Sequence, residues 1–233
     1  MVLGGSCERT AGGAAVDQLG YRPNRAARSL ATQHTDMVAL IVPEPDARLF
    51  SDLFFSVIVN AVNREFEDTH LQLVLMLADR GCEDTKLRPF LYEGHVDGAI
   101  VTSHHQVPHQ IQTLLNAPMV FIGRPTQAPT FNSWVDVDNT ESGRLGARRL
   151  IERGSRRPAI FTGPLDMLAA RDKLNGYTEV MESFKLPVQA IEGGFTSASG
   201  AECAARMSPD IVSGLIGGVY ASSDLMAIGA INR

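Results

Sequence analysis

The feature that most constrains this chain is a regular alternation, from residue 37 onward, of short apolar runs rich in β-branched residues with segments of helical periodicity. Such an alternation predicts parallel sheets covered by helices on both faces, in which ligands bind at the carboxyl ends of the strands. The predicted fold class is therefore α/β. The predicted strands are 37–42, 71–77, 98–102, 118–122, 135–137 (a strand or a crossover), 159–162, 189–192 and 218–221.

The predicted helices follow from apolar spacing and from capping residues. Asp52 is predicted to cap a helix whose apolar stripe is Phe55, Ile58, Val59, Val62 and Phe66. Asp138 or Asn139 is expected to cap a helix that runs to Gly154. Its predicted same-face ion pairs are Glu141–Arg144 and Arg148–Glu152. The other predicted helices are 84–94 (weakened by Pro89), 110–115, 168–184 (with the stripe Leu174, Tyr177, Met181 and Phe184), 200–207, and a last one capped by Asp224.

The composition excludes a disordered chain, a collagen-like chain and a small protein held together by disulfides. The chain has 233 residues, of which 44% are hydrophobic, and a formal net charge of −5, so it can bury the core of one large domain or two small ones. Cys7, Cys82 and Cys203 are few and scattered, which is typical of reduced thiols in a cytoplasmic protein. No apolar run approaches the roughly 18 residues that span a bilayer, and residues 1–16 lack the regions of an export signal. We therefore expect a cytoplasmic protein without membrane contact.

The sequence motifs of common enzymes are absent. The first predicted strand runs into Pro43-Glu44-Pro45 instead of a Gly-rich dinucleotide loop, and the chain has neither a phosphate-binding P-loop nor a nucleophile elbow. His104, His105 and His109 are the best candidates for metal ligands, but no Cys or acid lies close by in the sequence, which favours a polar loop. The chain is therefore predicted to be a binding module with no cofactor and no metal.

Charge is unevenly distributed along the chain. Residues 1–36 carry four Arg and three acids, a sum of +1, which leaves −6 for the rest. Residues 19–32 read LGYRPNRAARSLAT, in which Asn24 after Pro23 can cap a short helix over 25–31. Such a helix is too short to be stable alone in water. Two interpretations stay open: a linker with a solvated Arg face, or a helix that forms against a polyanionic partner.

Several motifs, in this order and spacing, resemble those of the lactose-repressor (LacI/GalR) family of bacterial transcription regulators. Residues 19–32 resemble the hinge of that family, and Phe121-Ile122-Gly123-Arg124 resembles its hydrophobic-Asp-Arg turn, with Gly123 in place of the usual Asp. The other matching motifs are Asp97-Gly98-Ala99-Ile100, Val137-Asp138-Asn139 with the helix that follows it to Gly154, Arg171 with Gly176-Tyr177, and Ser223-Asp224-Leu225-Met226-Ala227.

The resemblance implies two Rossmann-like, parallel-sheet subdomains that flank a cleft, similar to type I periplasmic sugar-binding proteins. It also implies a hinge helix, a helix-turn-helix head, and a homodimer that binds operator DNA. The expected segments are a degenerate or disordered N-terminus (1–16), the hinge (17–36), an N-terminal effector-binding subdomain (37–135) and an incomplete C-terminal one (136–233). Because the helix-turn-helix and the last strands of the family are not recognisable, we expect a truncated core that needs the full-length protein to bind its operator.

Site residues are carried over from the family by position. In the hinge, Leu30 is the expected wedge between base pairs in the minor groove, and its expected companions at the DNA are Asn24, Arg25, Ala27 and Arg28. The expected effector-binding residues are Arg171 (a charged contact), Phe195 (an aromatic that stacks on a ring), Ser223, Asp224, Phe54, Phe55 and Arg124. Alternatives stay open: Phe54 and Phe55 as core residues, Arg171 as a solvated charge, and Trp134 as either pocket rim or packing between subdomains.

The resemblance implies a one-component regulator, most simply a repressor, whose affinity for DNA is switched by a small molecule such as a sugar. An alternative is a solute-binding protein, for example for a sugar, with no role at DNA; the missing export signal and the basic hinge disfavour it. An enzyme on a similar fold ranks third, because the catalytic motifs are missing. The sequence names neither the effector nor the operator.

Overall fold

The computed structural model describes residues 31–32, 34–44, 46–77, 87–102, 118–125 and 133–233. The chain divides into two units, 1–36 and 37–233, and most of the first lies outside the described residues. The predicted helix 110–115 and the three histidines at 104, 105 and 109 also lie outside them. Within the described part of the chain, no helix is long and apolar enough to cross a membrane.

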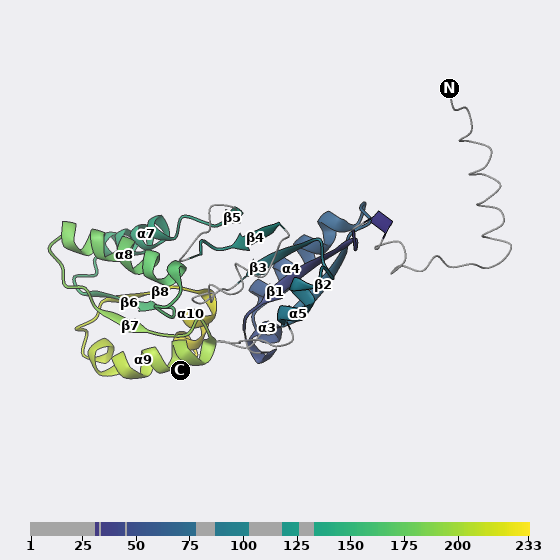
Figure 1. Ribbon diagram of the computed structural model, residues 1–233. Helices are drawn as coiled ribbons and strands as arrows, with labels where there is room; N and C mark the ends of the chain where they lie inside the picture. The colour runs from purple at the N-terminus through teal and green to yellow at the C-terminus, as the bar shows by residue number, and fades with distance from the viewer. Residues whose placement is uncertain (1–30, 33, 45, 78–86, 103–117, 126–132) are drawn as a thin grey trace, which may run out of the picture. The chain divides into compact units, whose positions relative to one another are not determined.

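The first sheet of the second unit has five parallel strands in the order β2-β1-β3-β4-β5 (Figure 1). They are β1 (Met37–Val42), β2 (Gln72–Leu77), β3 (Gly98–Thr102), β4 (Met119–Ile122) and β5 (Ser133–Val135). The last four residues of β1 are fully buried, as expected for a central parallel strand covered on both faces. The observed β5 lies two residues before the predicted strand 135–137, so residues 136 and 137 belong to the connection that follows it.

Helices cover both faces of the first sheet. They are α3 (Asp46–Ser51), α4 (Leu53–Phe66) and α5 (Leu87–Tyr92). Asp52 caps α4 as predicted, because its carboxylate accepts a hydrogen bond from Phe54 N at 3.0 Å. Phe55 packs with Leu40 and Val42 on one face, and Leu91 of α5 packs with the residues of the other face, which include Ala39, Ile41, Val101 and Phe121. In α5, Pro89 is the third residue, so its missing N–H falls in the first turn, where it costs no helical bond.

The second sheet has three parallel strands in the order β7-β6-β8, namely β6 (Pro158–Thr162), β7 (Ala190–Glu192) and β8 (Gly218–Ala221). Every residue of the central strand β6 is buried. Two helices, α7 (Asn139–Glu152) and α8 (Leu168–Ser183), lie on one side of the sheet, and α9 (Ser197–Val212) and α10 (Asp224–Ile231) lie on the other (Figure 1). The observed sheets and helices confirm the predicted α/β fold with parallel sheets.

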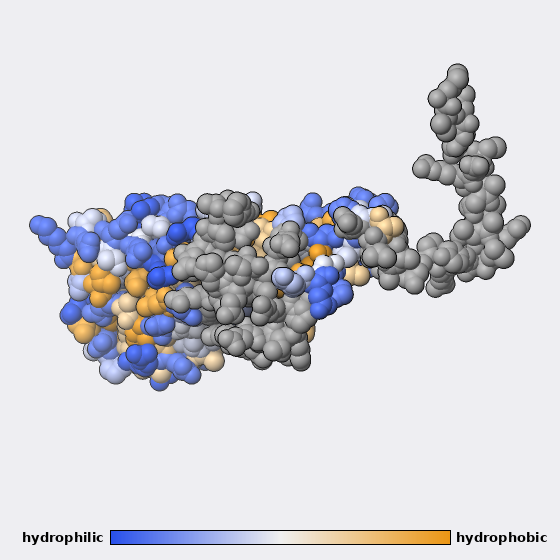
Figure 2. Space-filling view, viewed as in Figure 1, coloured by the Kyte–Doolittle hydropathy of each residue, from blue (hydrophilic) through white to orange (hydrophobic). Residues whose placement is uncertain are grey.

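The alternation of side chains along β6 divides the second core into two layers. Ala159 and Phe161 pack with residues of α9 and α10, which include Cys203, Met207 and Met226. Ile160 points to the other face and packs with residues of α7 and α8, which include Ala147, Tyr177 and Met181. The surface above these layers is mixed, with apolar side chains among hydrophilic ones (Figure 2).

Glycines let the helices of each pair approach closely. A Cβ atom at Gly143 of α7 would lie 2.0 Å from the carbonyl oxygen of Lys173 in α8, and one at Gly176 of α8 would lie 1.9 Å from that of Thr140. On the other side of the sheet, a Cβ atom at Gly229 of α10 would lie 1.8 Å from the carbonyl oxygen of Ser197 in α9. Real Cβ atoms cannot lie so close to backbone, so each contact requires glycine.

The predicted helix 200–207 was too short. The observed α9 starts at Ser197, because Thr196 and Ser199 form a capping box, and it continues through Pro209 to Val212. The sequence prediction of its ends relied on apolar spacing alone and so missed the reciprocal cap.

Three local predictions are also corrected. Ser223, not Asp224, is the N-cap of α10, because the Ser223 hydroxyl accepts from Met226 N at 3.3 Å. Arg148 pairs with Glu141 at 3.2 Å instead of Glu152, whose partner is Arg149 at 3.3 Å. Phe184, predicted as the last residue of a buried stripe, ends α8 and is 56% exposed. The predicted pair Glu141–Arg144 is confirmed, with an N–O distance of 3.1 Å.

Candidate functional site

The loops that follow β6, β7 and β8 meet at one edge of the second sheet, because the three strands are parallel. Hydrogen bonds join them. Gly193 N, after β7, donates to the Thr162 carbonyl of β6 at 2.9 Å, and Leu165 N donates to the Glu192 carboxylate at 3.0 Å. Ser222 N, after β8, donates to the Phe161 carbonyl at 3.0 Å. This edge is a rigid, polar rim of backbone at the place where α/β proteins bind ligands.

Phe195 lies on the loop after β7, at this edge. Its side chain is half-buried and packs against the core layer that contains Phe161. Its backbone has φ +59°, a left-handed conformation that is rare for a bulky side chain. The ring touches Gly163, the residue directly after β6. The structure therefore places the predicted stacking residue where one side of its ring is held by the core.

Arg171 lies one turn into α8, which follows the loop after β6. Its side chain is half-buried, and its Nε atom is fully buried with no hydrogen-bond partner among the described residues. Buried N–H groups are nearly always paired. This arrangement differs from the solvated helix charge that was the alternative for Arg171.

The end of β8 carries two serines with different roles. The Ser223 hydroxyl, predicted as an effector contact, caps α10, and Asp224 is exposed in the first turn of that helix. Ser222 is buried, and its hydroxyl has no partner among the described residues. Sequence reasoning missed Ser222. Its position directly after a predicted strand is the signal that could have indicated it.

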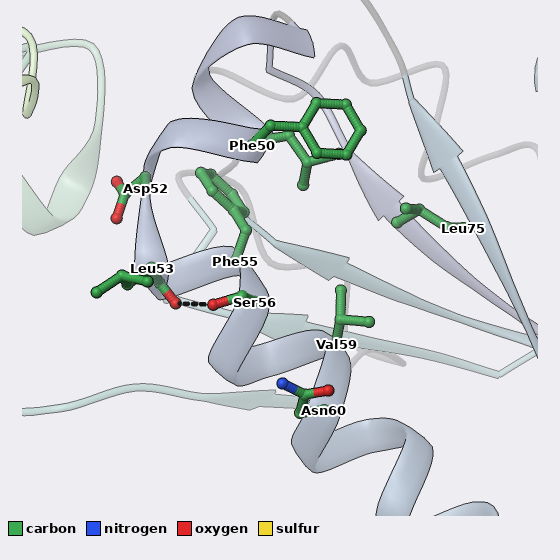
Figure 3. Close-up of a pocket in the computed structure, with 9 residues that line it drawn as sticks. Phe50, Asp52, Leu53, Phe55, Ser56, Val59, Asn60 and Leu75 are labelled. Carbon is green, nitrogen blue, oxygen red and sulfur yellow. Dashed lines mark hydrogen bonds between the residues drawn. The ribbon is translucent and has the colours of Figure 1, made fainter.

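Phe54 and Phe55, at the start of α4, have different environments. Phe55 is 1% exposed and belongs to the core, whereas Phe54 is 49% exposed; the two rings meet edge to face with centroids 5.3 Å apart. Phe55 also lines a hollow of about 280 Å³ (Figure 3). The other lining residues are Leu49, Phe50, Asp52, Leu53, Ser56, Val59, Asn60 and Leu75. Asp52 and Ser56 are engaged in local hydrogen bonds, so the hollow presents a mainly apolar surface.

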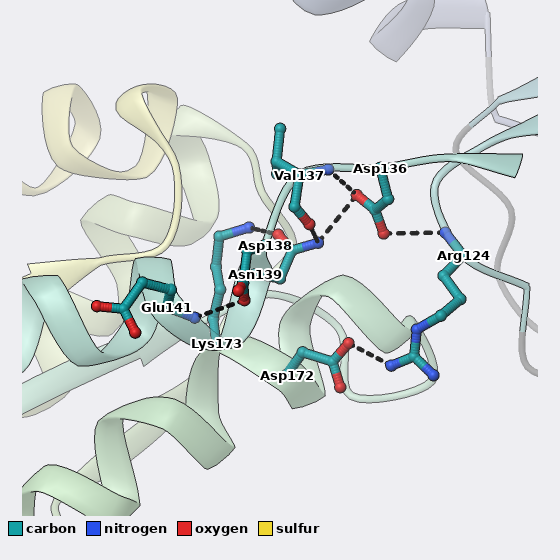
Figure 4. A network of polar contacts seen from close by, with 8 residues as sticks. All are labelled: Arg124, Asp136, Val137, Asp138, Asn139, Glu141, Asp172 and Lys173. Atoms are coloured by element: carbon teal, nitrogen blue, oxygen red, sulfur yellow. Dashed lines mark hydrogen bonds and ion pairs between the residues drawn. The ribbon is translucent and has the colours of Figure 1, made fainter.

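Arg124, on the connection between β4 and β5, contacts the second half of the chain. Its guanidinium donates to the Asp172 carboxylate of α8 at 2.5 Å, and its backbone N donates to Asp136 at 2.9 Å (Figure 4). Asp172 is the neighbour of Arg171 in α8. The predicted site residue Arg124 thus belongs to a polar network with Asp136 and Asp172, and Arg171 is the sequence neighbour of one member of this network.

Asp136 organises the connection between β5 and α7. One of its oxygens accepts hydrogen bonds from Val137 N at 2.8 Å and from the Asn139 amide at 3.0 Å, and the other accepts from Arg124 N (Figure 4). The Asn139 oxygen accepts from Lys173 Nζ at 2.5 Å. Burial lowers the pKa of Lys173, and the nearby carboxylates of Asp136 and Asp172 partly oppose this effect. Sequence reasoning missed this network, because residues that bond to each other in it lie up to 48 positions apart in the chain.

Other predicted residues lie outside this network. Trp134 is half exposed on the edge strand β5, opposite Phe121, and both of its interpretations stay predictions. Among the described residues, no three His, Cys, Asp or Glu side chains are grouped as metal ligands. The hinge residues Asn24, Arg25, Ala27, Arg28 and Leu30 lie outside the described residues, so their roles also stay predictions.

The chain is similar in sequence to transcription regulators. It is 38% identical over 226 residues to the HTH-type transcriptional regulator CelR of Thermobifida fusca, covering 93% of this chain and 65% of that protein. It is 28% identical over 231 residues to the HTH-type transcriptional repressor PurR of Proteus mirabilis, covering 96% of this chain and 65% of that protein. The chain thus spans slightly less than two thirds of the length of these relatives. No protein-family model matches it.

Solved structures agree with the sequence relatives. A complex of the transcriptional regulator CelR with cellobiose has a TM-score of 0.76 and 34% identity, over 98% of this chain and 69% of the other. A regulatory protein of the LacI family from Chloroflexus aggregans has a TM-score of 0.65 and 26% identity, over 84% and 72%. Together with the fold, these similarities show that the chain belongs to the LacI family of transcriptional regulators.

Proposed function

We propose that this chain is the effector-sensing core of a cytoplasmic transcription repressor, in which a sugar binds at the carboxyl ends of β6, β7 and β8 and switches the affinity for operator DNA. The observation that carries the proposal is the combination, at one sheet edge, of a half-buried aromatic ring with buried polar groups that have no partner among the described residues. Phe195 supplies the ring, and Arg171 Nε and Ser222 Oγ supply the polar groups. Small-molecule sites characteristically combine apolar walls with a few directed polar groups.

The proposed domain organisation follows the two sheets. Residues 37–135 form the N-terminal effector-binding subdomain, 136–233 form the C-terminal one, and 17–36 form the hinge behind a short N-terminal segment, 1–16. The division of the chain into units at residue 36 supports the start of the first subdomain. The separate five-stranded and three-stranded sheets support the boundary between the two subdomains.

A sugar is the proposed effector because its chemistry fits the candidate groups. The faces of a sugar ring carry C–H groups that pack on an aromatic ring, while its hydroxyls need directed donors and acceptors such as a guanidinium and a serine. The relative CelR has been solved in complex with cellobiose, so cellobiose is the first ligand to test. No metal or cofactor is needed for this switch.

The proposed mechanism is a population shift. An effector that binds one arrangement of the two subdomains more tightly than the other favours that arrangement. In the proposed homodimer, this shift orders or releases the two hinge segments, and it thereby changes the affinity for the operator. Leu30 is the proposed wedge in the minor groove, with Asn24, Arg25, Ala27 and Arg28 beside it.

The test is a footprint of the intact gene product on the DNA upstream of its own gene, with and without cellobiose and related sugars. We expect protection that one sugar alters. Leu30→Ala should weaken operator binding about tenfold or more, because it removes the apolar wedge, and should leave sugar affinity unchanged. Arg171→Ala should weaken sugar binding, because it removes a proposed donor to the sugar hydroxyls, and should leave operator binding unchanged.

The outcomes separate the proposal from its alternative. Sugar binding without any footprint would favour a solute-binding protein. Equal loss of both activities in Leu30→Ala would contradict the hinge assignment, and an unchanged sugar response in Arg171→Ala would remove that residue from the site.

A further inference from the structure

The positive φ of Phe195 is explained neither by a position after a helix nor by a residue type that tolerates this conformation. Lys185, another non-glycine residue with a positive φ, follows α8. Its backbone N donates to the Glu182 carbonyl at 3.0 Å, as residues after a helix commonly do. Asp36 is of a type that tolerates this conformation. Phe195 is a bulky residue that precedes a helix instead of following one. Such strain persists only where the surrounding structure fixes it, and it often marks a functional position.

The loop around Phe195 is fixed on both sides. Before it, Gly194 N donates to the Ser199 hydroxyl at 2.9 Å. After it, Thr196 N donates to the same hydroxyl at 3.2 Å, and the Thr196 hydroxyl accepts from Ser199 N at 3.1 Å. The capping box of α9 thus sets the direction in which the Phe195 side chain leaves the backbone.

The ring of Phe195 ends on Gly163. A Cβ atom at Gly163 would lie 2.0 Å from Cζ and 2.3 and 2.4 Å from the two Cε atoms of the ring. These are the outer atoms of the ring, so the ring reaches across the edge of the sheet from β7 to the end of β6. Any residue larger than glycine at position 163 would occupy the place of the ring.

We propose that Gly163 is a positioning residue for effector binding: its missing side chain lets the Phe195 ring lie over the end of β6, and this position sets the surface on which a sugar ring stacks. The inference rests on the proposed function for the role of the ring in binding, but the contact itself does not depend on it. Gly163 touches no effector in this proposal and acts only through Phe195.

A double-mutant cycle tests the contact without any ligand. Gly163→Ala in the otherwise unchanged chain should lower the midpoint of urea unfolding, because the ring must leave its place. In the Phe195→Ala background, the same substitution should have almost no effect. Gly194→Ala is the matched control, because a Cβ atom there would meet only Ser199 atoms, at 3.7 Å, an ordinary contact distance. Equal effects of Gly163→Ala in both backgrounds would overturn the proposal.

Cellobiose binding, measured by calorimetry at a temperature where every variant is fully folded, tests the positioning role. We expect Gly163→Ala to weaken binding about tenfold, as the loss of a well-placed aromatic contact does. Leu145→Ala, at an exposed position of α7, should bind as the unchanged chain does. Adding Gly163→Ala to Phe195→Ala should cause no further loss. A folded Gly163→Ala variant with unchanged affinity would overturn the role in binding. If the unchanged chain binds no sugar, the proposed function fails, while the unfolding cycle still decides whether Gly163 positions the ring.

Discussion

At the scale of single residues, the buried hydroxyl of Tyr177 lowers the stability of the fold, because it has lost water and gained no partner among the described residues. Its side chain is fully buried in the layer between α7, α8 and β6, and its hydroxyl has no hydrogen-bond partner among the described residues. Burial raises its pKa above the usual value of about 10. Tyr220, on β8, is a useful contrast, because its hydroxyl lies 3.2 Å from the Ser142 hydroxyl.

We predict that Tyr177→Phe raises the free energy of unfolding by about 1 kcal/mol, because it removes a desolvated hydroxyl without removing a hydrogen bond. Urea unfolding at pH 7 measures this change. As the matched control, Tyr220→Phe should lower the free energy of unfolding by a similar amount, because it breaks a bond. A loss of stability in Tyr177→Phe would show that its hydroxyl is paired.

The same substitution should change the pH dependence of stability. Above pH 10 the unfolded chain releases its tyrosine protons, whereas folded Tyr177 keeps its proton. The unfolded state then binds fewer protons than the folded state, so the free energy of unfolding falls as the pH rises. Tyr177→Phe should make this fall less steep between pH 9.5 and 11, and burial of Tyr220 should account for part of what remains.

At the scale of elements, the second sheet is covered by two helix pairs that meet through glycine. The α7–α8 pair uses Gly143 and Gly176, and the α9–α10 pair uses Gly200 and Gly229. In each pair the backbones approach too closely for any side chain at these positions. These contacts fix the helices that carry Arg171 and the cap of α10, so they support the candidate site indirectly.

We predict that Gly143→Ala lowers the free energy of unfolding by about 2 kcal/mol or more, because a Cβ atom there would collide with the backbone of α8. At an open helix position the same change stabilises by about 1 kcal/mol, so the sign is diagnostic. Leu145→Ala, at an exposed position of the same helix, is the control and should change stability by less than about 0.5 kcal/mol. Stabilisation by Gly143→Ala would contradict the close contact.

At the scale of the whole molecule, the helix α8 contributes two residues, Asp172 and Lys173, to the polar network that joins residues 37–135 to residues 136–233. Asp172 binds Arg124 of the first half, Lys173 binds Asn139 at the connection, and Arg171 is the proposed effector contact. Three successive residues of α8 thus have three different partners: the proposed effector for Arg171, Arg124 for Asp172 and Asn139 for Lys173. Because the three residues are consecutive in one helix, we expect a shift of α8 on effector binding to disturb the Arg124–Asp172 and Asn139–Lys173 contacts as well.

We predict that Asp172→Asn changes the ratio of operator affinities with and without effector by several-fold, a coupling change of about 1 kcal/mol. The free energy of unfolding should change by about 1 kcal/mol or less, because the Arg124 side chain is 42% exposed and water screens the pair, although the Asp172 side chain is only 17% exposed. The control is Glu152→Gln, which removes a surface pair with Arg149. An unchanged affinity ratio in Asp172→Asn would exclude the pair from the switch.

The proposed homodimer requires an apolar surface, and α3 and α4 present one. Phe50 and Leu53 line the hollow of Figure 3 and are largely exposed. Val57, one turn after Leu53 in α4, is also largely exposed, and such an apolar patch is typical of an interface. We predict that Val57→Asp shifts the intact protein from dimer to monomer in sedimentation velocity. Asn63→Asp, which adds the same charge at another exposed position of α4, should leave the dimer intact. A dimer that survives Val57→Asp would place the interface elsewhere.

The sequence by itself determined the family and most of the elements, although it did not predict the helix α3. Strands 37–42, 98–102 and 218–221 were predicted to the residue, and Asp52 was identified as a cap, because periodicity and capping act over a few neighbouring residues. The tertiary structure alone decided which polar groups are paired. The Arg124–Asp172 pair and the contact of Phe195 with Gly163 depend on distances between segments far apart in the chain, and so does the lack of a partner for the Ser222 hydroxyl in the part of the chain that the structure describes. Local patterns carry no such distances, because close packing sets them only when the sheets and helices come together.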